Sequence, residues 1–237
     1  MTFNGTIISV RLLGATLALA TCGLLTGNAQ AQNRLFVSLD DNSIVSYDIS
    51  LATAADVEAS KVVFTSTNLS YPYGLAIDSS GNLFAANAGA NTISKFDSTG
   101  TFVSTIGSNS NLNNPFGLAI DSSGNLYAAN AGANTISKFD STGSFQSTIG
   151  SGNLSAPYGL AFDSTGNLYA ANNTGNTISK FDSTGSFLFR FNAPSGTQPR
   201  YLTIGGNPPA VPEPGAVAFG IIAAGSVLGL VARKRRS

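Results

Sequence analysis

Apolar and polar residues alternate in short segments through the middle of the chain, and each segment ends in a turn-forming sequence. In residues 117–121, Leu118 and Ile120 alternate with small neighbours, the two-residue period of a β-strand. Residues 121–124 (D-S-S-G) predict a tight turn, because Asp bonds its own following backbone and Gly accepts a positive φ. Further strands are predicted at residues 126–130, 135–140 and 145–149. The segment therefore predicts a four-stranded antiparallel meander.

This meander occurs three times in almost the same sequence. Residues 74–100 recur as residues 117–143 with Tyr127 in place of Phe84, and a third copy at residues 159–185 has five differences from the second. The prolines that precede the repeats lie 43, 42 and 42 residues apart: Pro72, Pro115, Pro157 and Pro199. A fixed period of this size indicates a repeat architecture. A four-stranded unit repeated radially is a β-propeller blade.

The flanks of the three repeats contribute a partial fourth copy. Residues 34–38 and 42–48 match the second and third strands of the repeat, and residues 61–66 supply an outer strand. The missing first strand appears at residues 199–204 (P-R-Y-L-T-I), where the repeat breaks off. We therefore predict an all-β fold, a small β-propeller of about four four-stranded blades whose last blade is closed by both termini. Such closure removes an exposed sheet edge; an arc completed by a second chain is the alternative.

The blade sequence P-[YF]-G-L-A-[IF]-D-S-[ST]-G-N-L-[YF]-A-A-N, followed by N-T-I-S-K-F-D-S-T-G, resembles the NHL repeat. The resemblance is strong from Pro72 to about Pro199 and weak in the flanks. It implies a propeller whose loop-rich face binds proteins, glycans, small molecules or RNA, depending on the member. A fold hosts many functions, so the resemblance does not identify the ligand.

The N-terminal residues predict export. An apolar run at residues 12–25 is followed by A-Q-A, which is typical of a signal peptide cleaved between Ala31 and Gln32. An uncleaved anchor helix and a lipoprotein modified at Cys22 are the alternatives. The run is short for a membrane span, and Thr21 stands where a lipoprotein usually has glycine or alanine. Secretion is therefore the favoured interpretation.

The C-terminal residues predict sorting to the cell envelope. A VPEP motif precedes the uncharged residues 215–232, and a basic cluster follows; these residues are Val211, Pro212, Glu213 and Pro214, then Arg233, Lys234, Arg235 and Arg236. The uncharged stretch suffices for a single transmembrane helix, and the basic cluster predicts a stop-transfer signal on the cytoplasmic side. This order resembles the PEP-CTERM sorting signal. It implies an exosortase-type processing partner and an inner-membrane-anchored precursor that reaches the envelope or exterior. A plain single-span anchor is the alternative.

These segments define the expected organisation of the chain. A signal peptide, an NHL-like propeller, a linker, a transmembrane helix and a basic cytoplasmic tail are expected at residues 1–31, 32–207, 208–214, 215–232 and 233–237. Within the propeller the repeats are residues 72–114, 115–156 and 157–198, and the split blade combines residues 199–206 with 33–71.

Composition narrows the functions open to the propeller. Histidine is absent, and Cys22 is the only cysteine, so the cleaved protein forms no disulfide. Residues 34–200 carry seven basic and eleven acidic residues, a net charge of −4. A mildly acidic domain without a basic cluster argues against nucleic acid as a partner.

Polar residues recur at fixed places in the repeats. Two aspartates per repeat could form a calcium-binding ring, since oxygen ligands suit that ion; they are Asp78, Asp121, Asp163, Asp97, Asp140 and Asp182. Each precedes Ser and Gly, however, so turn structure is favoured and no cofactor is expected. The same choice between turn geometry and a polar rim applies to Asn87, Asn130, Asn172, Asn91, Asn134 and Asn176. One lysine per repeat is expected in solvent: Lys95, Lys138 and Lys180.

Enzymatic interpretations find little support in the residue inventory. Glu58 is the only glutamate of the propeller, and there is neither a histidine base nor a cysteine nucleophile. Propeller lactonases of the senescence-marker type use a glutamate with asparagine and aspartate, and Glu58 lies in the divergent residues 51–60, so the match fails. We predict an exported, non-catalytic binding or structural module with an envelope polysaccharide or surface protein as partner. A lactonase-like, metal-dependent hydrolase is the alternative.

Overall fold

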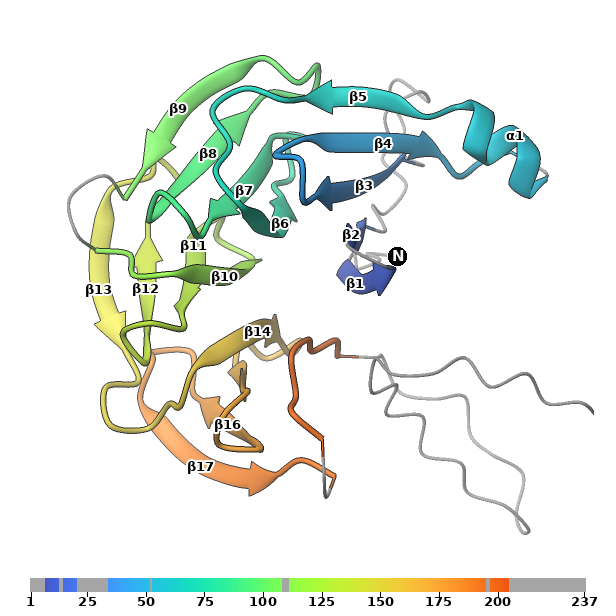
Figure 1. Cartoon of the computed structure of the whole chain (residues 1–237). Helices are drawn as coiled ribbons and strands as arrows, with labels where there is room; N and C mark the ends of the chain where they lie inside the picture. The colour runs from blue at the N-terminus through green and yellow to red at the C-terminus, as the bar shows by residue number, and fades with distance from the viewer. Residues whose placement is uncertain are drawn as a thin grey trace, which may run out of the picture.

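The computed structural model describes residues 7–12, 15–20, 34–51, 53–107, 111–194 and 197–204. Within them the chain forms four antiparallel β-sheets that follow one another along an arc (Figure 1). We number the sheets I to IV in chain order. The all-β class and the antiparallel meander predicted from sequence are confirmed.

Sheets II, III and IV are the three sequence repeats. Sheet II holds β6 (Pro72–Ile77), β7 (Leu83–Asn87), β8 (Thr92–Phe96) and β9 (Phe102–Ile106). Sheet III holds β10 (Pro115–Ile120), β11 (Leu126–Asn130), β12 (Thr135–Phe139) and β13 (Phe145–Ile149). Sheet IV holds β14 (Pro157–Phe162), β15 (Leu168–Asn172), β16 (Thr177–Phe181) and β17 (Phe187–Asn192). In each sheet the strands pair in chain order, so every repeat is a meander as predicted.

Sheet I is built differently from the prediction. Its strands are β1 (Ile7–Leu12), β2 (Ala15–Ala20), β3 (Arg34–Leu39), β4 (Ile44–Asp48) and β5 (Val62–Thr65), paired in that order. A six-residue helix, α1 (Ala54–Ala59), joins β4 to β5; the sequence pattern did not predict it, and its N-cap is Thr53.

The prediction that residues 199–204 supply the first strand of the blade that contains residues 34–38 is wrong in this structure. The inner edge of β3 pairs with β2, with Leu17 opposite Val37. Residues 201–204 form no strand. The strand β2 comes from the predicted signal peptide, and it competes for the same row of backbone hydrogen bonds.

The core lies between successive sheets. We call the side of a sheet that faces the next sheet in chain order its downstream face, and the opposite side its upstream face. Phe84, Ile93 and Ile106 on the downstream face of sheet II pack against Leu126 and Phe139 of sheet III. Equivalent residues of sheet III pack against sheet IV, and sheet I contributes Phe36 and Ile44 to a third cluster with sheet II. The arc is therefore held together by the same kind of contact at each joint.

Apart from residues 7–12 and 15–20 of the predicted signal peptide, the predicted targeting signals lie outside the described residues. This applies to the cleavage site at Ala31 and Gln32, to the VPEP motif at residues 211–214, to the predicted helix at residues 215–232 and to the basic cluster at residues 233–236. In the described part of the chain, no helix is both long and apolar enough to span a bilayer.

Candidate functional site

The inner strands of sheets II, III and IV meet at one end through a repeated backbone irregularity. In β10, Pro115 is opposite Asn130 and Leu118 is opposite Ala128, so the register shifts across Phe116 and Gly117. A Cβ atom on Gly117 would overlap the carbonyl oxygen of Tyr158 in the next sheet. Glycine is therefore required here because two backbones are in contact.

Aromatic rings stack across these irregular ends. The ring of Phe116 lies 4.4 Å from that of Tyr73 and 4.1 Å from that of Tyr158, measured between centroids, with interplanar angles of 27° and 10°. Each ring comes from the residue between the proline and the glycine of its repeat. The sequence pattern P-[YF]-G contained this signal, but sequence analysis alone did not assign it to a site.

Residues 200–202 continue the row at sheet IV. The guanidinium carbon of Arg200 lies 5.9 Å from the ring centroid of Tyr158, within the range of a cation–π contact. A Cβ atom on Gly159 would lie only 2.7 Å from the Arg200 carbonyl oxygen and 2.8 Å from the Tyr201 Cα. The segment thus lies beside sheet IV where a further inner strand would begin. Residues 200–202 therefore lie where a first strand would be placed, but they do not form a strand.

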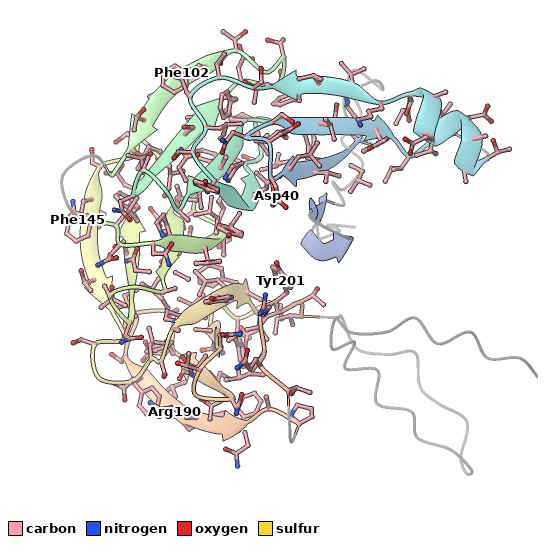
Figure 2. All side chains as sticks on the ribbon, viewed as in Figure 1. Asp40, Phe102, Phe145, Arg190 and Tyr201 are labelled. Carbon is pink, nitrogen blue, oxygen red and sulfur yellow. The ribbon has the colours of Figure 1, made fainter. Side chains whose placement is uncertain are left out.

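A shallow hollow of about 50 Å³ lies along this row and is lined by aromatic, glycine and leucine residues. They are Tyr73, Gly74, Leu75, Phe116, Gly117, Leu118, Tyr158, Gly159, Leu160, Tyr201 and Leu202. The volume is well below the roughly 300–1,000 Å³ of sites that enclose a whole small molecule. Figure 2 shows Tyr201 and Asp40 on the inner side of the arc, and Phe102, Phe145 and Arg190 on its outer side. The hollow suits contact with one face of an extended ligand.

The recurrent aspartates are turn residues. Asp121 accepts hydrogen bonds from the Ser123 and Asn125 amides, both at 2.9 Å, from the Asn125 side chain at 2.8 Å and from the Tyr127 hydroxyl at 3.1 Å. Asp140 accepts from the backbone and hydroxyl of Thr142 and from the Ser144 amide. Their carboxylate oxygens are thus occupied by local donors. Among the described residues, no group of three or more acidic, histidine or cysteine side chains could hold a metal ion.

The first set of recurrent asparagines forms an internal link rather than a polar rim. Asn130 is buried. Its side-chain oxygen accepts from the Asn113 amide at 3.3 Å, and its nitrogen donates to the hydroxyls of Thr135 at 3.2 Å and Ser137 at 2.8 Å. Ser137 in turn donates to the Asn111 carbonyl. Asn87 and Asn172 make the equivalent contacts in their sheets.

Two asparagines of the second set, Asn91 and Asn134, tie one sheet to the next. Asn91 has a φ of 53°, in the left-handed region that asparagine tolerates in tight turns, and its side chain accepts from the Asn114 amide at 2.6 Å. Asn42 and Asn134 do the same for Tyr71 and Ala156. Turn geometry, favoured from sequence, is confirmed for these residues.

The lysines are not simply solvated. Lys138 Nζ lies 5.4 Å from the ring centroid of Tyr127, and Lys95 and Lys180 lie similarly over Phe84 and Tyr169. Burial, followed by the nearby charge of Asp121, raises the pKa of Tyr127 above its ordinary value. The phenol therefore stays protonated and acts as a hydrogen-bond donor.

Two polar features of sheet IV differ from those of sheets II and III. Burial alone would raise the pKa of Asp163, but hydrogen bonds from Asn167 and Thr165 outweigh it and lower that pKa well below its usual range. Lys180 Nζ lies 3.9 Å from Asp163 Oδ2. Asn173 stands where the second repeat has Ala131, and its side-chain nitrogen is buried without a hydrogen-bond partner.

Comparison with known proteins identifies the architecture. No family model and no curated protein matches the chain, whereas many solved structures do. A structure of streptogramin B lyase aligns with a TM-score of 0.51 and 24% identity over 58% of this chain and 46% of the lyase. A luciferin-regenerating enzyme aligns at 0.60 and 18% over 81% and 73% of the two chains. A nidogen/laminin complex aligns at 0.59 and 16% over 83% of each.

The chain has a β-propeller fold. At these identities the comparison establishes the fold alone, and the chain spans less than half the length of the streptogramin B lyase that it resembles. The neighbours include two enzymes and a protein from a binding complex.

The prediction that the chain is not an enzyme is contradicted by this comparison, because enzymes are among the neighbours with the same fold. The sequence argument counted residue types. A propeller brings residues from distant repeats to one face, so a sparse inventory of bases does not exclude catalysis on this scaffold.

Proposed function

We propose that the chain is an exported β-propeller of NHL-like repeats that acts as a binding module at the cell envelope, with an envelope polysaccharide as its ligand. A PEP-CTERM-like tail would direct it there through an exosortase-type partner. The proposal for its location rests on the signal sequence ending near Ala31 and on the order of the VPEP motif, uncharged stretch and basic cluster after Val211.

The observation that carries the binding proposal is the row of rings along the inner strands. Tyr73, Phe116 and Tyr158 line one continuous apolar hollow, and Arg200 extends it. Because the rings stack on one another, they present their edges to the hollow. This apolar strip suits the C–H faces of sugar rings, while tyrosine hydroxyls and guanidinium groups can bond sugar hydroxyls. A shallow site repeated along an arc fits an extended polymer better than an enclosed small molecule.

Isothermal titration calorimetry tests the proposal, with the full chain titrated by the polysaccharide fraction or by the protein fraction of the native host envelope. We expect the polysaccharide to bind, and Tyr158→Ala and Arg200→Ala to weaken binding by about tenfold or more, the scale expected for central contact residues. Phe145→Ala is the control, because this ring lies on the outer side of the arc (Figure 2).

Tyr158→Phe is a matched variant. Phenylalanine already occupies the equivalent position at Phe116 in a folded repeat, so this change keeps the stack and removes only the hydroxyl. Binding confined to the protein fraction, or equal affinity for all variants, would refute the polysaccharide assignment. Release of shortened polysaccharide products would assign a catalytic role to the same site.

A further inference from the structure

The downstream face of sheet IV is uncovered, although it is built like faces that are buried elsewhere in the chain. Ile106, Ile149 and Phe191 occupy one register position, opposite Ile93, Ile136 and Ile178 respectively. The two isoleucines are 5% and 7% exposed because the next sheet covers them, whereas Phe191 is 42% exposed. Sheet IV therefore presents an inter-sheet surface with no sheet of this chain packed on it among the described residues.

The outer strand of sheet IV makes this face more apolar than its equivalents. The strands β9 and β13 read F-V-S-T-I and F-Q-S-T-I, whereas β17 reads F-L-F-R-F-N. Phe189 replaces Ser147 on the downstream face, is 50% exposed, and its ring lies 6.3 Å from that of Phe191. A terminal repeat adapted to water would gain polar residues here. The gain of two aromatic rings instead indicates a surface that is covered by a partner.

The other end of the arc carries a matching surface. Leu35 and Tyr47 pair on the upstream face of sheet I, as Leu126 and Phe139 do on that of sheet III. Leu126 and Phe139 are 2% and 1% exposed because sheet II covers them, whereas Leu35 and Tyr47 are only half-buried and Val63 on the outer strand is 60% exposed. Within the described residues, extensive contacts between sheets run from I to II, II to III and III to IV, and none of that extent joins IV to I. Both halves of an inter-sheet contact are thus present in one chain, at opposite ends.

Charge favours the same pairing. Residues 34–65 carry five acidic and two basic residues, a net charge of −3, whereas residues 157–204 carry three basic and two acidic residues, a net charge of +1. Opposite net charges at the two ends steer the ends of different molecules together.

We propose that the downstream face of sheet IV docks on the upstream face of sheet I of a second copy, so that copies associate head to tail. The contact repeats the one that already joins successive sheets inside each chain, with Phe189 and Phe191 facing Leu35, Tyr47 and Val63 of the other copy. Such a heterologous contact closes into a ring when the rotation allows it and otherwise extends the array. This inference does not depend on the ligand proposed above.

Disulfide trapping distinguishes association from closure within one chain. In full chains that carry Cys22→Ser and are kept in a mild detergent, Phe189→Cys and Val63→Cys are introduced either in separate chains or in the same chain. After oxidation, mixed single variants should give a covalent dimer, and the double variant should give covalent oligomers. A cross-linked monomer from the double variant, or no cross-link in either sample, would overturn the proposal.

Sedimentation of the wild-type chain across a range of concentrations supplies the second test. Phe189→Ser installs the residue that the folded sheet III has at this position, Ser147, so it should fold and weaken association by about tenfold or more. Val103→Ser, on the outer strand of sheet II, should leave association unchanged. A wild type that stays monomeric, or a Phe189→Ser variant that associates as the wild type does, would refute head-to-tail docking.

Discussion

The buried asparagine link offers a direct test of how the repeats hold together, and Asn130→Ala is the perturbation. This change removes three hydrogen bonds, to the Asn113 amide, the Thr135 hydroxyl and the Ser137 hydroxyl. Asn130 is buried at the joint between β11, β12 and the segment that enters from sheet II. Its partner Ser137 is buried as well, so water has little access to that hydroxyl when Asn130 is removed.

The expected loss follows from these contacts. A hydrogen bond between neutral groups contributes about 1 kcal/mol net, and a buried donor left unsatisfied costs about 1–3 kcal/mol. The three bonds together predict a loss of about 2–4 kcal/mol in the free energy of unfolding. Asn87→Ala and Asn172→Ala should cost similar amounts, because their sheets contain the same contacts.

Urea unfolding followed by far-ultraviolet circular dichroism measures this loss. The midpoint should fall while the slope m stays constant, since the surface exposed on unfolding does not change. Ser122→Ala is the control, because Ser122 is an exposed turn residue between two strands of the same sheet, and a change within about 0.5 kcal/mol is expected. If Asn130→Ala lost less than about 0.5 kcal/mol, the link would not be a stabilising element.

Three further predictions concern stability and sorting. Leu118→Ala should cost about 2–4 kcal/mol in urea unfolding, because Leu118 is buried between sheets II and III; a tolerant Leu118 would mean that this joint is loose. The Thr142 hydroxyl bond lowers the pKa of Asp140, so its stabilising effect is present above the unfolded-state pKa and disappears as the pH falls through the folded-state pKa. The melting temperature should therefore drop as the pH falls below about 4, the ordinary range of an aspartate, and Asp140→Asn should reduce that drop; an unchanged profile would contradict it. Pro212→Ala with Glu213→Ala should leave the full-length chain in the cytoplasmic membrane if the tail is a sorting signal, whereas identical masses and fractions for wild type and variant would favour a plain anchor.

Local sequence was enough to predict the blades. The alternation around Leu118 places side chains on opposite faces of a strand, and Asp-Ser-Ser-Gly turns fix where one strand ends and the next begins. Both signals act over fewer than about ten residues. The strands of sheets II to IV accordingly lie where the pattern placed them, and the aspartates proved to be turn residues.

The candidate site needed the three-dimensional arrangement. The P-[YF]-G pattern is visible in the sequence, but a stack of Tyr73, Phe116 and Tyr158 exists only because glycines let neighbouring backbones touch across sheets. The burial of Asn130 likewise depends on where the connection from the preceding sheet passes. No local pattern distinguishes a buried asparagine from one in an exposed turn.

The ends of the arc were decided by tertiary structure alone. From the sequence, residues 199–204 were expected to complete the blade that starts at residue 33, because the missing strand reappears there. The structure pairs β3 with β2 instead and leaves Phe189 and Phe191 exposed. Which strand occupies a sheet edge depends on competition between distant segments for the same backbone groups, and no local pattern records the outcome of that competition. The sequence by itself therefore determined the repeat and its strands, whereas the joints between sheets and the state of the two ends were determined only by packing.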